Sequence, residues 1–224
     1  MHHFIVIDYQ NDFCTKGGKW FKERPCQTFI EKTLIPFFRI NKLKFSEIIS
    51  DYRLPRPNET IDYCVPETWG YQSAIPSDIK KQNVWIKAMN SPEWVRENIG
   101  DPNGIPGLPY PDSIAFSQWL EKTIGKPNQD DQIVLIGLTL DCCVLCTAQQ
   151  LYFRGYNVKI LKEATDVYDV ETAKTYIKDG DDYKDFLFQT THGMWSKAIS
   201  WDDLSLELQA TLPAKDVCSF RAKL

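Results

Sequence analysis

The sequence is poor in histidine: it has three, and two of them, His2 and His3, lie at the amino terminus. A site that needs several clustered imidazoles is therefore not expected. Long apolar runs are also missing, since the longest, 5–7 and 133–136, are far too short to cross a bilayer. With 26 Lys and Arg against 30 Asp and Glu, the chain has no excess positive charge for a nucleic-acid backbone. We therefore expect neither a membrane nor a nucleic acid as a partner.

What the chain does contain predicts a folded protein. A hydrophobic fraction of 43% with 13% aromatic residues argues against disorder, and 224 residues are enough for a sizeable core. We expect one domain over residues 1–224. The start of the chain goes straight into a strand-like run, so no signal peptide is expected. The seven cysteines are scattered, which in such a chain indicates reduced thiols and a cytoplasmic location.

Short apolar runs of strand type alternate with helical patterns along the chain. Continuous apolar runs are typical of strands buried on both faces, as in parallel sheets. The alternation predicts an α/β fold with three layers, α-β-α, around a mostly parallel, Rossmann-like sheet of about six strands. The expected strands are 4–8, 45–51, 83–87, 132–137 and 158–161, and the expected helices lie near 26–42, 112–125, 143–154 and 170–178.

Three segments fall outside this alternation. Two are long loops rich in proline, near 52–72 and 90–111, and the third is a C-terminal extension after about residue 207. Long loops in compact domains are often lids or interfaces. A simple excursion over the surface is an equally good interpretation of either loop.

Reactive side chains stand where the predicted strands end. Asp8, Asp51 and Lys87 end three of them, and Cys143 follows the fourth after a short turn. Sheets of this kind place their sites at the carboxyl ends of the strands, so these side chains are expected to meet. A thiol at the start of a helix is favoured as thiolate by the helix dipole and by a nearby lysine. Asp8 is then a candidate general base for Cys143.

Three motifs carry a family resemblance. Residues 7–13 read IDYQNDF, Lys87 follows the run VWI, and residues 137–148 read GLTLDCCVLCTA. Together they resemble the isochorismatase-like cysteine hydrolases, a family that includes nicotinamidases and carbamoyl-amide hydrolases. The resemblance covers about residues 4–170. It implies a catalytic set of Asp8, Lys87 and Cys143. It also implies an oxyanion hole formed by the backbone N–H groups of Thr139 and Cys143, next to a cis Leu138–Thr139 bond.

The chain departs from the pattern where metal-dependent members hold their ion. Their Asp-x-His reads Asp51-Tyr52-Arg53 here, and Tyr63 precedes Cys64 in place of a histidine. A protonated guanidinium has no lone pair to ligate a metal, and one carboxylate alone is a poor zinc site. We therefore predict no metal and no cofactor. Arg53 is expected either to pair with Asp51 or to bind a substrate carboxylate through its planar fork.

The loss of the metal ligands bears on the substrate that the resemblance implies. In metal-dependent members the ion anchors the pyridine nitrogen of nicotinamide, whereas metal-free members act on carbamoyl, ureido or related amides. A small amide of that second kind, cleaved through a thioester on Cys143, is therefore the first hypothesis. Phe13, Arg53, Tyr63 and Trp69 are the candidate substrate-binding residues. The resemblance further implies a homo-oligomer, a dimer or a tetramer.

Several alternatives stay open. The protein is a nicotinamidase in the second hypothesis and a catalytically inactive relative used for binding or assembly in the third. A papain-like dyad of Cys143 with His192 is possible in principle, although the usual flanking motif is absent. Cys143 and Cys146 also form a C-x-x-C, but it occurs late in the chain, away from the position of a thioredoxin-like redox motif.

Overall fold

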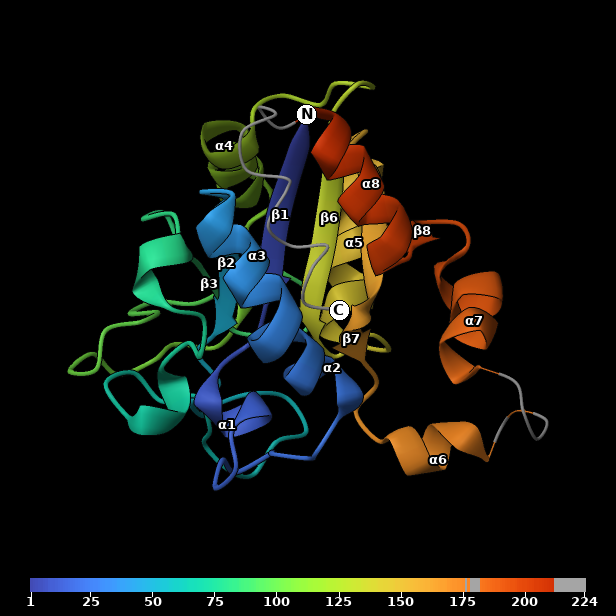
Figure 1. Cartoon of the computed structure of the whole chain (residues 1–224). Helices are drawn as coiled ribbons and strands as arrows, with labels where there is room; N and C mark the ends of the chain where they lie inside the picture. The colour runs from blue at the N-terminus through green and yellow to red at the C-terminus, as the bar shows by residue number, and fades with distance from the viewer. Residues whose placement is uncertain (176, 178–181, 212–224) are drawn as a thin grey trace.

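A six-stranded sheet forms the centre of the fold in the computed structural model, which describes residues 1–175, 177 and 182–211 (Figure 1). Its strand order is β3-β2-β1-β6-β7-β8, and all five neighbouring pairs are parallel. The strands are β1 (His2–Ile7), β2 (Phe45–Ser50), β3 (Trp85–Lys87), β6 (Gln132–Leu138), β7 (Asn157–Asp166) and β8 (Lys197–Ile199). The predicted parallel sheet is thereby confirmed.

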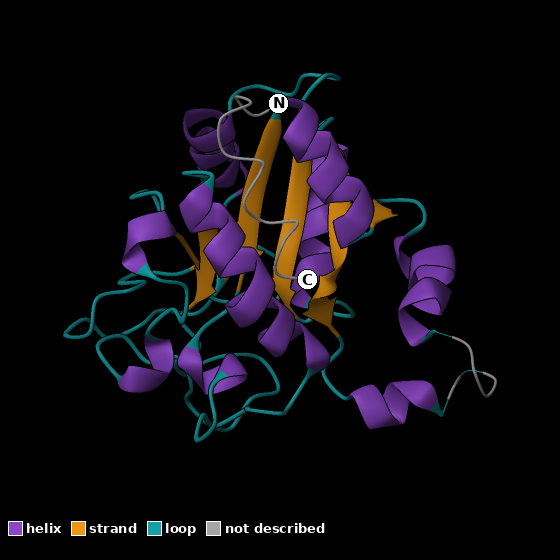
Figure 2. Cartoon of the chain, viewed as in Figure 1, coloured by secondary structure: helices purple, strands orange, loops and turns teal. Residues whose placement is uncertain are grey.

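Helices cover both faces of this sheet (Figure 2). On one face lie α2 (Pro25–Phe29), the π-helical turn η1 (Ile30–Leu34), α3 (Ile35–Ile40) and α8 (Trp201–Thr211), and on the other lie α4 (Ser113–Ile124) and α5 (Cys143–Phe153). Side chains alternate along β1, so Phe4 and Val6 belong to one core cluster while Ile5 and Ile7 belong to the other. The predicted three-layer α-β-α architecture is therefore confirmed.

Shorter elements complete the described chain. They are α1 (Asn11–Cys14), η2 (Trp69–Tyr71), η3 (Ser77–Ile79), β4 (Trp94–Val95), β5 (Tyr110–Pro111), α6 (Val170–Lys174), α7 (Tyr183–Leu187) and the π-helical turn η4 (Phe188–His192). The loop near 52–72 thus contains η2, and the loop near 90–111 contains the antiparallel pair β4–β5. No helix in the described ranges is long and apolar enough to cross a bilayer. Of the predicted C-terminal extension, residues 207–211 belong to α8 and the rest lies outside the described residues.

Local signals explain where the elements begin and end. The Asp112 side chain accepts a hydrogen bond of 2.8 Å from the Ala115 N–H and caps α4, and Gly125 ends that helix with φ +87°. β7 is longer than the predicted 158–161, because a register shift against β6 lets its pairing continue to Asp166. β8 was not predicted: two of its three residues are exposed, so it lacks the apolar run that identifies the other strands.

One glycine allows β6 to approach β1 closely near the carboxyl ends of the two strands. Gly137 has φ +106°, and a Cβ at this position would lie 2.1 Å from the carbonyl oxygen of Ile7. Only glycine fits such a contact. The close approach brings the residue after β1, Asp8, next to the turn that leaves β6.

Candidate active site

The ends of β1 and β3 and the start of α5 bring Asp8, Lys87 and Cys143 together, as the sequence predicts. The Lys87 Nζ lies 2.8 Å from the Asp8 Oδ2 and 3.5 Å from the Cys143 Sγ. All three side chains are buried, with exposed fractions of 2%, 0% and 7% in that order. A buried ammonium therefore bridges a carboxylate and a thiol at one edge of the sheet.

Two residues at the end of the second strand join this set: Ser50 is its last residue, and Tyr52 follows two positions later. The Ser50 hydroxyl donates to the Asp8 Oδ1 at 2.7 Å, and the Lys87 Nζ donates to the Ser50 Oγ at 2.9 Å and to the Tyr52 hydroxyl at 2.7 Å. Sequence reasoning missed both. The available signal was the period-two spacing of Ser50 and Tyr52, which places them on the same side of an extended chain beside the strand end that carries Lys87.

The turn between β6 and α5 presents unpaired amides. Its Leu138–Thr139 peptide bond is cis, as the resemblance implies. The neighbouring N–H groups of Leu140, Cys142 and Val144 donate to backbone carbonyls. The N–H groups of Thr139 and Cys143 have no hydrogen-bond partner within the described residues. Both residues line a cavity, so these amides are available to an oxygen atom beside the Cys143 sulfur.

Charges and burial set the protonation of the site. The adjacent Cys142 thiol, followed by burial, raises the pKa of Cys143 well above its ordinary value, although Lys87 opposes the rise. The Cys143 thiol in turn lowers the pKa of Cys142. Burial is the largest single influence on Lys87 and lowers its pKa, but the contacts with Asp8 and the two neighbouring cysteines together outweigh burial, so the pKa of Lys87 rises. The resting site therefore holds a charged ammonium beside a protonated Cys143 thiol.

A cavity of about 270 Å³ opens at this set. Its lining residues are Asp8, Phe13, Trp20, Tyr52, Glu59, Tyr63, Asn90, Leu138, Thr139, Cys142, Cys143 and Tyr168. Of the predicted substrate-binding residues, Phe13 and Tyr63 line the cavity. Trp69 does not, and its side chain is 48% exposed. The walls are thus largely aromatic rings.

Part of this wall was not predicted. Trp20 packs its ring between those of Tyr63 and Tyr168, with centroid distances of 5.5 and 6.1 Å. Behind the wall, the Arg56 guanidinium lies 4.7 Å from the centre of the Tyr63 ring and 3.6 Å from the Glu59 carboxylate. Unlike Tyr63, the other four residues come from segments with no strand end and no motif, so the sequence carries no signal that would place them near the cavity.

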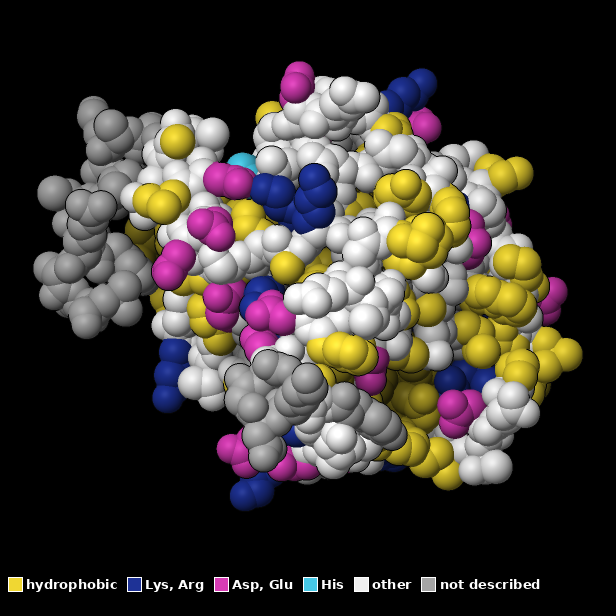
Figure 3. Space-filling model, turned by 90° about the vertical axis from the view of Figure 1, so that its right-hand side faces the viewer, with side chains coloured by type: hydrophobic (Ala, Val, Ile, Leu, Met, Phe, Trp, Pro, Cys, Tyr) yellow, Lys and Arg dark blue, Asp and Glu magenta, His cyan; other side chains and the backbone are white. Residues whose placement is uncertain are grey.

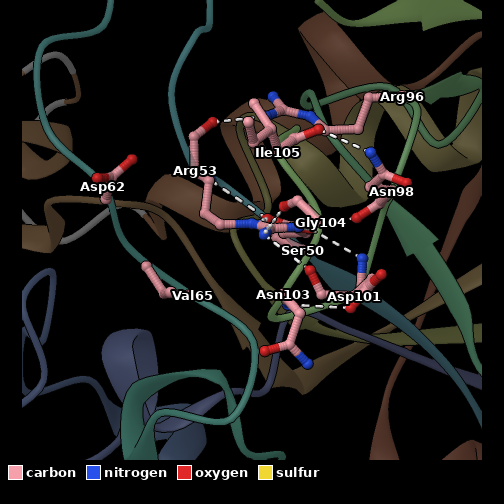
Figure 4. A network of polar contacts seen from close by, with 12 residues as sticks. Ser50, Arg53, Asp62, Val65, Arg96, Asn98, Asp101, Asn103, Gly104 and Ile105 are labelled. Atoms are coloured by element: carbon pink, nitrogen blue, oxygen red, sulfur yellow. Dashed lines mark hydrogen bonds and ion pairs between the residues drawn. The ribbon is translucent and has the colours of Figure 1, made fainter. Parts of the chain in front are cut away.

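Arg53 lies in a network of polar contacts (Figure 4). Its Nε and Nη2 donate to the two carboxylate oxygens of Asp51 at 2.9 and 2.7 Å. Its remaining N–H groups donate to the carbonyl oxygens of Asn98, Asp101 and Gly104. All five donors of the guanidinium are used, and Arg53 does not line the cavity. Of the two roles predicted for Arg53, the geometry supports pairing with Asp51 and leaves no donor for a substrate carboxylate.

The pairing of Arg53 with Asp51 also occupies the carboxylate that a metal ion would need. Both oxygens of Asp51 accept hydrogen bonds from Arg53, and the Gly100 N–H donates to the Asp51 Oδ2 at 2.9 Å. In the described part of the chain, no group of three or more His, Cys, Asp or Glu side chains is placed to hold a metal ion. A positively charged guanidinium thus neutralises the carboxylate that survives from the metal-binding pattern.

His192 does not form a dyad with Cys143. It is buried in η4, and its Nε2 lies 2.8 Å from the carbonyl oxygen of Leu140. This contact supports the turn before α5 from behind. The geometry therefore favours Asp8 and Lys87 over His192 as the partners of the thiol.

Comparison with known proteins agrees with the motifs. A family model described as the isochorismatase domain matches residues 113–185. Among solved structures, an isochorismatase-like hydrolase from Alkaliphilus metalliredigens is similar with a TM-score of 0.59 and 17% identity, over 94% of this chain and 98% of that chain. No match was found among curated proteins.

Two other structures share the fold. The nicotinamidase/pyrazinamidase from Bacillus subtilis has a TM-score of 0.57 and 17% identity, over 88% of this chain and 98% of its own. The N-carbamoylsarcosine amidase from Thermoplasma acidophilum has a TM-score of 0.53 and 15% identity, over 89% of this chain and 95% of its own. In its sequence pattern and fold, the chain therefore resembles the isochorismatase-like hydrolases.

Proposed function

We propose that the protein is a metal-independent cysteine hydrolase that cleaves the C–N bond of a small amide through a thioester on Cys143. The observation that carries this proposal is the buried contact of Lys87 with Asp8 and with the Cys143 thiol, next to a cavity that Asp8 and Cys143 line. A carboxylate, an ammonium and a thiol in contact provide a base, a fixed positive charge and a nucleophile.

The proposed reaction begins when Asp8 takes the proton of the Cys143 thiol and the sulfur attacks the amide carbonyl carbon. The unpaired N–H groups of Thr139 and Cys143 stabilise the resulting oxyanion. The C–N bond then breaks, and ammonia or an amine leaves with the proton that Asp8 returns. Water, deprotonated by Asp8, attacks the thioester carbon; the C–S bond breaks, and the sulfur regains the proton. Lys87 stays charged throughout and holds the carboxylate and the sulfur together.

The cavity supports a small substrate with a neutral acyl group. No lysine or arginine is among its lining residues, while Asp8 and Glu59 are, so a carboxylate on the substrate would find no partner at the cavity surface. Amides of the carbamoyl or ureido type meet this requirement when they carry no acid group. Nicotinamide is the second candidate, because Phe13, Trp20 and Tyr63 offer flat walls to an aromatic ring and a nicotinamidase shares the fold.

The decisive experiment measures ammonia release from a panel of primary amides, ureas and nicotinamide. We expect turnover of at least one, and a loss of roughly 10³-fold or more in the Cys143→Ala variant. Cys146→Ala is the matched control, because Cys146 lies one helical turn further along α5 and does not line the cavity. Full activity of Cys143→Ala with an unchanged melting temperature would refute the proposal.

Chelation tests the metal-independent part separately. Since Arg53 already occupies both oxygens of Asp51, prolonged treatment with EDTA should leave the turnover rate unchanged. Loss of activity that zinc, manganese or iron restores would contradict this part alone. Absence of turnover on the whole panel by folded wild-type protein would instead support the inactive binding protein.

A further inference from the structure

Tyr52 is the aromatic residue of the cavity wall that touches the reacting sulfur. Its side chain is 2% exposed, and its hydroxyl oxygen lies 3.6 Å from the Cys143 Sγ. The ring is held edge-to-face by Phe13 and Tyr63, at centroid distances of 6.3 and 5.0 Å. Arg56 covers the ring with its guanidinium carbon 4.3 Å from the centroid. The position of this hydroxyl is therefore fixed by packing on several sides.

The direction of the hydrogen bonds at this hydroxyl follows from the chemistry of its partners. A lysine ammonium only donates, so in the 2.7 Å contact between the Lys87 Nζ and Tyr52 the hydroxyl oxygen accepts. The proton of the hydroxyl must then point elsewhere. Two acceptors are within reach, the Asn90 Oδ1 at 3.4 Å and the Cys143 Sγ at 3.6 Å. The Tyr52 proton is thus aimed at the sulfur or at the amide beside it.

Lys87 alone does not supply all the hydrogen bonding that a thiolate at Cys143 needs. Its ammonium has three N–H groups but five acceptors around it. Their distances from the Nζ are 2.7 Å to Tyr52, 2.8 Å to Asp8, 2.9 Å to Ser50, 3.2 Å to the carbonyl of Met89 and 3.5 Å to the Cys143 Sγ. The sulfur is the most distant of the five, so the protons of Lys87 are directed first to oxygen atoms. A thiolate at Cys143 therefore needs a second donor.

We propose that Tyr52 is a catalytic residue whose hydroxyl, polarised by Lys87, donates a hydrogen bond to the Cys143 thiolate. While the thiol is protonated, the Tyr52 proton is directed at the Asn90 Oδ1. When Asp8 takes the thiol proton, rotation about the C–O bond of Tyr52 turns its proton to the sulfur. Tyr52 keeps its proton throughout, so no bond to oxygen is broken. This inference rests on the proposed function, because it concerns the thiolate of the same nucleophile.

The surroundings keep Tyr52 in its donor form. Burial, and then the charges of the Cys143 thiolate form and of the Asp8 carboxylate, raise the pKa of Tyr52 well above its ordinary value. A tyrosine that stays protonated over the working pH range donates without titrating itself. It thus differs from Asp8, which must gain and lose a proton in each cycle.

The test is the pH dependence of Cys143 alkylation by iodoacetamide, followed residue by residue with mass spectrometry. In Tyr52→Phe, which keeps the ring and removes only the hydroxyl, the midpoint should move upward by about one to two pH units. Tyr156→Phe is the matched control, since Tyr156 is a buried tyrosine with one hydrogen bond, to the Gly125 carbonyl, outside the cavity lining. An unchanged midpoint in folded Tyr52→Phe protein would overturn the inference and leave Lys87 as the only donor.

Turnover provides the second readout. On a substrate found in the panel, Tyr52→Phe should lower kcat by about tenfold to a hundredfold with little change in KM, because the hydroxyl acts on the sulfur. If kcat/KM instead fell by the same factor because KM rose while kcat stayed constant, the result would contradict the inference and assign Tyr52 to substrate binding. If Tyr52→Phe does not fold, replacing Tyr52 with the more acidic 3-fluorotyrosine tests the same bond, with the midpoint moving downward. Alkylation needs no substrate, so failure of the proposed function is recognised separately, by absent turnover in the wild type.

Discussion

At the scale of single residues, the nucleophile is distinguished from its neighbour by contacts rather than by sequence. Cys142 and Cys143 are adjacent, and both line the cavity. Only Cys143 lies within hydrogen-bonding distance of Lys87 and Tyr52, at 3.5 and 3.6 Å. The start of a helix alone favours thiolate at either position. The two partners, Lys87 at the end of β3 and Tyr52 just after the end of β2, are therefore what selects Cys143.

The neighbouring Cys142 thiol should oppose the ionisation of Cys143. Since the adjacent Cys142 thiol is the largest cause that raises the pKa of Cys143, its removal in Cys142→Ala should lower that pKa. We expect the midpoint of Cys143 alkylation to move to lower pH, and alkylation at pH 7 to become faster. Site-resolved mass spectrometry measures this, with Cys146→Ala as the control. A midpoint that stays constant or rises would show that the adjacent thiol does not oppose ionisation.

At the scale of elements, Arg53 ties a long loop to the sheet. The residue follows the end of β2, and its guanidinium holds the carbonyl oxygens of Asn98, Asp101 and Gly104 in the loop near 90–111 (Figure 4). The Arg53 carbonyl in turn accepts a 2.7 Å hydrogen bond from the buried Arg96. Here an internal cation connects the loop to the sheet.

Removal of this cation should destabilise the protein. In Arg53→Ala the buried Asp51 carboxylate and three carbonyl groups lose their donors, which we expect to lower the free energy of unfolding by about 3 kcal/mol. Arg39→Ala is the matched control, because Arg39 also makes a two-point contact, with Asp78, but both side chains are exposed, and little change is expected. Urea denaturation of both variants measures the difference. Equal, small effects would show that the loop is held by other contacts.

The elements also show what sequence patterns predict and what they do not. Five strands and the joint position of Asp8, Lys87 and Cys143 were predictable, because apolar runs identify strands and parallel strands end at one edge. β8 was not, because it is short and mostly exposed. The hydrogen bonds of Ser50 and Tyr52 depend on which strand lies beside β2, a property of the tertiary structure. Trp20 and Tyr168 approach the cavity along irregular segments, where no period fixes the direction of a side chain.

At the scale of the whole molecule, the surface mixes apolar and charged groups. Figure 3 shows hydrophobic side chains gathered in patches between charged ones on one face. Large apolar side chains that are more than half exposed include Phe153 at 66% and Met194 at 72%. Exposed apolar side chains are ordinary in folded proteins. The homo-oligomer implied by the resemblance would cover some of this surface, and it stays a prediction that sedimentation velocity can test.

The stability of the whole fold should depend on pH through its buried histidine. Burial lowers the pKa of His192 below 6.5, although the Leu140 carbonyl and Asp141 oppose the shift. Below about pH 6.5 the unfolded chain therefore binds a proton that the folded chain does not, and the free energy of unfolding falls as the pH decreases. One such proton contributes at most about 1.4 kcal/mol per pH unit, and nothing above about pH 7.5. The loss stops once the pH reaches the folded pKa.

Urea denaturation between pH 7.5 and 5.5 measures this dependence. His3 also has a pKa lowered by burial, so the wild type should lose stability through both groups. His192→Gln keeps a donor for the Leu140 carbonyl but cannot titrate, so its stability should fall less steeply over the same range, whatever its absolute value. The carboxyl groups whose pKa is lowered, such as Glu207, lose their stabilising effect only at lower pH and do not confuse the comparison. Identical slopes for the variant and the wild type would mean that His192 is protonated equally well in the folded chain, and that its contact behind the nucleophile turn is not sensitive to pH.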